Sequence, residues 1–131
     1  MRQPDFDLDF RDGQQGELFV AWIIECLRKG TAEVKTDRRA ILTGNLYIET
    51  ECLRGGQYRD SGIRESHADC YVFVVGQLAL AVPTESLRAM VNSGQFREGA
   101  CKNGSNPTNG TLIPIRSFVD WMRKEATSGR E

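Results

Sequence analysis

The fold is decided by residues 31–51, which read TAEVKTDRRAILTGNLYIETE. Residues 31–37 form a short run in which alternate side chains point to opposite sides, and this pattern predicts a strand. Residues 46–51 alternate in the same way and predict a second strand. Because the connection between the two strands is short, we expect them to pair as a hairpin.

Apolar patterns on either side of this segment predict an α/β fold, with a central mixed β-sheet flanked by helices. Residues 14–29 repeat apolar side chains at helical spacing, and Gly30 is expected to end that helix. Residues 68–75 are apolar on both faces, which is typical of a central strand. The other expected elements are a loop over 53–67, a strand over 78–82, a helix over 84–93, a loop over 99–110, an edge strand over 112–115 and a helix over 117–124.

The 131 residues have the length of one domain, which we place at residues 14–124 between a flexible lead-in at 1–13 and a flexible tail at 125–131. The formal net charge of -1 provides no overall basic field, so a nucleic-acid partner would need a local basic patch. No apolar run approaches the ~20 residues of a membrane span. The first residues do not resemble a signal peptide, which predicts a cytoplasmic protein. The four cysteines form no CxxC pair and the chain has one histidine, so a zinc site is not expected.

Acidic side chains lie on one side of each of the two predicted strands. Asp37 ends the first strand, and Glu49 and Glu51 share a side of the second. Carboxylates that approach closely repel one another unless a cation or a proton joins them. Magnesium prefers oxygen ligands, and one or two carboxylates with a substrate phosphate suffice to bind it. Lys35 shares the side of Asp37, where an ammonium would orient a water or stabilise developing charge.

The order of these residues resembles the PD-(D/E)XK nuclease superfamily, and small phage-type members in particular. Gly16-Glu17 stands at the start of the predicted first helix, Asp37 at a strand end and Glu49 on the next strand. The resemblance spans roughly residues 12–75 and includes Ser61-Gly62-Ile63, Ser66 and Ala68-Asp69.

This resemblance implies a restriction-endonuclease-like α-β-β-β-α-β core and metal-dependent hydrolysis of phosphodiester bonds in DNA. Asp37 and Glu49 would bind Mg²⁺ or Mn²⁺, with Glu17 completing or supporting the shell. Lys35 or Glu51 would position the attacking water. Because many single-domain members pair to cut two strands, the resemblance also implies a homodimer. Contacts to the nucleic-acid backbone are expected from Arg38, Arg39, Arg54, Arg59, Arg64 and Ser61.

The sequence departs from the family pattern two residues after Glu49, where Glu51 replaces the usual lysine. Some restriction-enzyme members resemble this Glu-x-Glu arrangement, and in others the lysine lies on a neighbouring strand, a role that Lys35 would fill. An alternative register takes Glu33-Val34-Lys35 as the Glu-x-Lys motif. The departure leaves two rival functions open. One is a nucleic-acid-binding or protein assembly module that kept the fold without hydrolysis, and the other is a nuclease directed at RNA.

Overall fold

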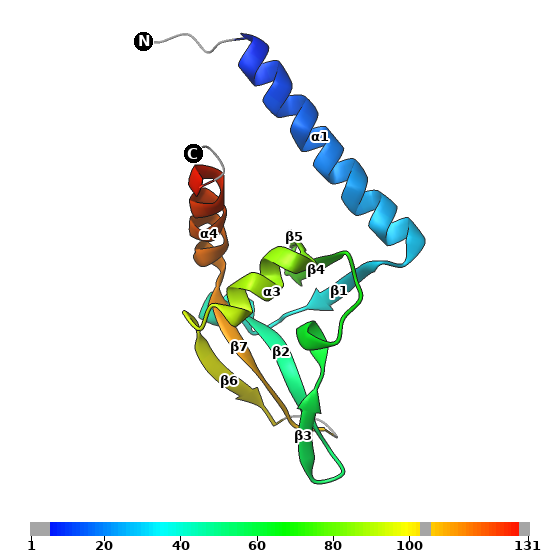
Figure 1. The fold of residues 1–131 in the computed structure, drawn as a ribbon, viewed down its shortest axis with the longest axis vertical. Helices are drawn as coiled ribbons and strands as arrows, with labels where there is room; N and C mark the ends of the chain where they lie inside the picture. Colours follow the sequence, from blue (N-terminus) through cyan, green and yellow to red (C-terminus); the bar gives the residue numbers. More distant parts are fainter. Residues whose placement is uncertain (1–5, 103–105, 129–131) are drawn as a thin grey trace.

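The computed structural model describes residues 6–102 and 106–128, which form four α-helices, one short 3₁₀ helix and seven strands (Figure 1). In chain order these are α1 (Phe6–Lys29), β1 (Ala32–Thr36), α2 (Ala40–Thr43), β2 (Asn45–Arg54), β3 (Gln57–Asp60), the 3₁₀ helix η1 (Gly62–Arg64), β4 (Cys70–Val75), β5 (Leu78–Pro83), α3 (Thr84–Asn92), β6 (Arg97–Cys101), β7 (Thr108–Pro114) and α4 (Ile115–Ser128). The α/β class is confirmed.

The strands form two sheets, where one central sheet was expected. The first has the order β1-β4-β5, with β1 parallel and β5 antiparallel to β4. The second is antiparallel, with the order β3-β2-β7-β6. The central position of β4 is confirmed, and its first four residues are buried. β4 pairs with β1 on one edge and with β5 on the other. Both of its faces are covered, with Tyr71 and Phe73 in one apolar cluster and Cys70 and Val72 in another, as expected for a strand that is apolar on both faces.

The predicted hairpin between residues 31–37 and 46–51 is wrong. β1 pairs with β4, whereas β2 pairs with β3 and β7. The short connection contains helix α2, which ends at Gly44 in a left-handed conformation (φ 73°) and redirects the chain into the other sheet. A short connection therefore did not lead to pairing between the strands it joins.

The main core lies where the two sheets and helices α3 and α4 meet. It contains Leu46 and Ile48 from β2, Phe73 from β4, Leu87 from α3 and Phe118 from α4, all at most 3% exposed. A second, smaller cluster of Cys26, Cys70 and Val72 attaches the C-terminal end of α1 to the first sheet. Figure 1 shows that the rest of α1 extends away from the body.

Several element boundaries differ from those expected. Helix α1 begins at Phe6, so residues 6–13 of the expected lead-in are helical, while residues 1–5 lie outside the described residues. The expected loop 53–67 contains β3 and η1. The expected loop 99–110 contains most of β6 and the start of β7. Pairing with neighbouring strands supplies the backbone hydrogen bonds of these segments, and such pairing leaves little local sequence pattern.

Two further expectations concern the C-terminal part of the chain. The strand with Pro114 is β7, an inner strand between β2 and β6, so the expected edge position is wrong. Pro114 is its last residue, where a missing backbone N–H is tolerated. Helix α4 continues to Ser128, and the last three residues lie outside the described part. Among the described helices, none has the length and apolar character that a membrane crossing requires.

Candidate functional site

A cleft of about 720 Å³ is lined by residues from both sheets. It collects Lys35 and Asp37 at the end of β1, the following Arg38 and Arg39, and Glu49 of β2. These five residues were all predicted site residues. The fold therefore brings Lys35, Asp37 and Glu49 to one cleft, although their strands belong to different sheets.

Asp37 holds the two sheets together at the edge of this cleft. Its Oδ1 accepts a hydrogen bond from the backbone N–H of Ala40 at 3.1 Å, and its Oδ2 accepts one from the N–H of Tyr47 at 3.0 Å. Its own N–H donates to the carbonyl of Val74. A carboxylate has about four lone-pair sites, so these two bonds leave acceptor capacity for a cation. Asp37 thus has a structural function whether or not it binds metal.

A β-bulge separates Glu49 from Glu51. Glu49 lies opposite Gly110 of β7 and Glu51 lies opposite Asn109, so Thr50 is an extra residue in the strand. The bulge turns Glu51 to the other face, where it accepts a hydrogen bond from Asn109 at 2.7 Å and pairs with Arg64 at 3.5 Å. The expectation that Glu49 and Glu51 share a side is therefore wrong. Only Glu49 lines the cleft.

The backbone beneath Glu49 is tightly packed. A Cβ added to Gly62 of η1 would lie 2.2 Å from the Glu49 carbonyl oxygen, so only glycine fits there. The Glu49 side chain is half-buried and makes no hydrogen bond or ion pair to the residues that the structure describes. The cleft therefore contains an acceptor whose capacity remains available to a ligand.

The ammonium of Lys35 pairs with Glu33 at 3.0 Å, and both side chains are about half exposed. Glu33 and Lys35 are two residues apart on β1, so their side chains lie on the same side of the strand.

The cleft has an excess of positive charge. Its charged lining residues are four cations, Lys35, Arg38, Arg39 and Arg97, and two carboxylates, Asp37 and Glu49, which leaves a net charge of +2. Arg97 belongs to β6, a segment for which the sequence pattern predicts no strand and, from residue 99, a loop. The alternation of Arg97, Gly99 and Cys101 on one side of β6 was the available signal, but the neighbouring Gly and Asn residues favoured a loop.

Tyr47 also lines the cleft and is uncharged at neutral pH. Burial raises the pKa of the Tyr47 phenol, and the effect exceeds the opposing hydrogen bond with Thr108 at 2.8 Å. The phenol therefore contributes a hydrogen-bonding group without adding negative charge.

The remaining predicted residues lie outside the cleft. Glu17 lies in the middle of α1 and is exposed to solvent, whereas the sequence predicted it at the start of a helix. Arg54 and Arg59 are exposed on the β2–β3 hairpin. Arg64 pairs with Asp60 as well as Glu51. Ser61 is buried, at 4% exposed.

No family model matches the chain, and no curated protein or solved structure matches it either. The site must therefore be judged by its own chemistry. Within the described residues, no group of three or more His, Cys, Asp or Glu side chains is arranged to hold a metal ion. Asp37 and Glu49 provide hard oxygen donors that suit Mg²⁺ or Mn²⁺, provided that substrate and water complete the coordination.

Proposed function

We propose that this cleft binds DNA and hydrolyses its phosphodiester bonds with the help of a divalent metal ion. The observation that carries the proposal is the meeting of Lys35, Asp37 and Glu49 in a cleft with an excess of positive charge. A phosphodiester is anionic, so the four cations favour its binding, while the two carboxylates provide for a metal ion. The restriction-endonuclease-like core implied by the resemblance is part of this proposal.

Asp37 and Glu49 would hold Mg²⁺ or Mn²⁺ together with substrate oxygens. When bound, such an ion polarises the phosphate and lowers the pKa of a bound water. Arg38, Arg39 and Arg97 would bind the nonbridging phosphate oxygens, since a guanidinium matches phosphate with two parallel hydrogen bonds. Lys35, held by Glu33, would orient the attacking water or stabilise the charge that develops on the phosphate.

A second function is favoured by the hydrogen bonds of Asp37. Both of its carboxylate oxygens are already bound to backbone N–H groups, which is sufficient reason for an aspartate at this position. If Asp37 serves only to join the sheets, the cleft would bind nucleic acid without cutting it, as a binding or assembly module. The two functions predict different results for cleavage. The nuclease cuts nucleic acid and needs Glu49 to do so, whereas the binding module does not cut it.

The experiment compares Glu49→Gln with Glu51→Gln in a plasmid-nicking assay with Mg²⁺ or Mn²⁺. The two residues lie on the same strand but on opposite faces, so Glu51→Gln is a matched control. We expect the wild type and Glu51→Gln to nick DNA. We expect Glu49→Gln to lose at least a hundredfold in rate, of the order seen when a group that stabilises the transition state is removed, while still binding DNA.

Equal activity of the two variants would contradict the role given to Glu49. Binding of linear, nicked or branched DNA without cleavage under either metal would establish the binding module instead. Matched RNA substrates complete the comparison, and cleavage of RNA alone would reject DNA as the substrate.

A further inference from the structure

Helix α1 carries an apolar surface that the rest of the described chain leaves uncovered. Its exposed large apolar side chains, with their exposed fractions, are Leu18 70%, Phe19 41%, Val20 53%, Trp22 38%, Ile24 58% and Leu27 49%. At roughly 200 Å² for a fully exposed large side chain, the six side chains together leave about 600 Å² open to solvent, distributed over more than one side of the helix. Apolar side chains that form a contiguous exposed patch mark a surface for interaction with another molecule.

Only one side of α1 contacts the body of the protein. Cys26 is the one fully buried side chain among residues 13–29, and the half-buried Ile23 packs beside it. Val20, Ile24 and Leu27 lie at i, i+4 and i+7 and form a separate exposed row, which we call the α1 stripe. Figure 1 shows α1 reaching the body only at its C-terminal end, so this row is accessible to another molecule.

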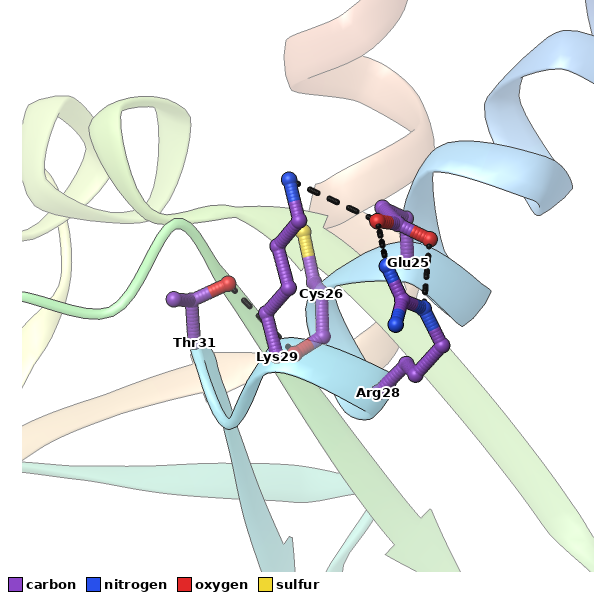
Figure 2. Close-up of polar contacts among 5 residues, drawn as sticks. All are labelled: Glu25, Cys26, Arg28, Lys29 and Thr31. Carbon is purple, nitrogen blue, oxygen red and sulfur yellow. Dashed lines mark hydrogen bonds and ion pairs between the residues drawn. The ribbon is translucent and has the colours of Figure 1, made fainter.

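Charge is distributed unevenly along α1. The half before residue 18 has a net charge of -3, from the sequence positions Asp7, Asp9, Arg11, Asp12 and Glu17. The last turn has the opposite sign. Figure 2 shows one carboxylate, Glu25, bound by both Arg28 (Nε at 3.0 Å) and Lys29 (Nζ at 3.4 Å), which leaves one net positive charge there. The helix is thus acidic in its first half and basic at its end.

We propose that two copies of this chain associate through α1, as an antiparallel helix pair in which the two α1 stripes contact each other. In an antiparallel pair centred between residues 22 and 23, position 17 of one helix lies opposite position 28 of the other. Glu17 lies three residues before Val20 and Arg28 four residues after Ile24, so both flank the α1 stripe on the same side. Each Glu17 then meets Arg28 of the partner.

The charges favour a second copy over other occupants of this surface. An antiparallel pair is self-complementary, because Glu17 of each helix lies beside the basic last turn of the other helix. A parallel pair would place like charges together. Helices that bind anionic membrane surfaces carry lysine and arginine on their polar side, whereas the first half of α1 is acidic. This proposal is independent of the function proposed for the cleft.

The association is tested by sedimentation equilibrium over a range of protein concentrations. We expect a wild-type dimer with a dissociation constant in the micromolar range or below. Ile24→Glu places a charge in the α1 stripe and should raise that constant at least tenfold. Leu18→Glu is the matched control, since it makes the same chemical change on another side of α1 and should leave a dimer. Circular dichroism verifies that both variants remain helical.

The orientation is tested by mixing two charge variants. Glu17→Arg alone and Arg28→Glu alone each bring like charges together at both ends of the pair and should weaken the dimer several-fold. An equimolar mixture restores opposite charges at both ends, and dimers should return. A wild type that stays monomeric, including one that binds neutral phosphatidylcholine vesicles instead, overturns the proposal. If the equimolar mixture contains no more dimer than either variant alone, the antiparallel arrangement is overturned.

Discussion

Replacing Gly62 with alanine measures how closely η1 packs against the strand that carries Glu49. The added Cβ would lie 2.2 Å from the Glu49 carbonyl oxygen and 2.9 Å from the Glu49 Cβ, so the turn or the strand must move. Gly62 also has a φ of +55°, which costs an L-residue about 1–2 kcal/mol. Overpacking in a close-packed region adds about 1–3 kcal/mol. We therefore expect Gly62→Ala to lower the free energy of unfolding by about 2–5 kcal/mol.

Gly55→Ala provides the matched control for this change. Gly55 has nearly the same φ, +58°, but nothing lies within 4 Å of the Cβ position. Its substitution should cost only the conformational part, about 1–2 kcal/mol. The difference between the two variants in urea unfolding isolates the contact with Glu49. If Gly62→Ala is no more destabilising than Gly55→Ala, the close packing beneath the cleft is refuted.

Three further measurements test the core and the site. Asp37→Ala leaves the backbone N–H groups of Ala40 and Tyr47 without their acceptor and should cost about 2–4 kcal/mol; an unchanged melting temperature would show that Asp37 does not join the sheets. Phe73→Ala removes a fully buried ring and should cost about 3–5 kcal/mol in denaturant unfolding; a cost below about 1 kcal/mol would place Phe73 outside the core. Burial raises the pKa of the Cys70 thiol from 9.0 to about 11, with the neighbouring Cys26 contributing. Because the folded state favours the neutral thiol, the free energy of unfolding should fall as the pH rises from about 9 to about 11, and Cys70→Ala should reduce this dependence; the same slope in both proteins would contradict the buried position of Cys70.

The cleft was partly predictable because five of its charged residues lie in one stretch, from Lys35 to Glu49. Their types and order suggested an anionic substrate and a cation before any geometry was known. Arg97 was not found, because β6 is held by pairing with β7 and its own sequence favours a loop. Glu51 was assigned to the wrong face, since strict alternation along a strand fails at a bulge.

The sequence by itself determined the local elements whose side chains repeat with a clear period. It indicated the strand that became β1, the central strand β4 and the helix α3, because the periodicity of a helix or strand is contained within a few consecutive residues. Only the tertiary structure decided that β1 pairs with β4, that Thr50 bulges and that Asp37 joins two sheets. These outcomes depend on which distant backbone and side-chain groups satisfy one another, and such pairings carry no periodic signal along the chain.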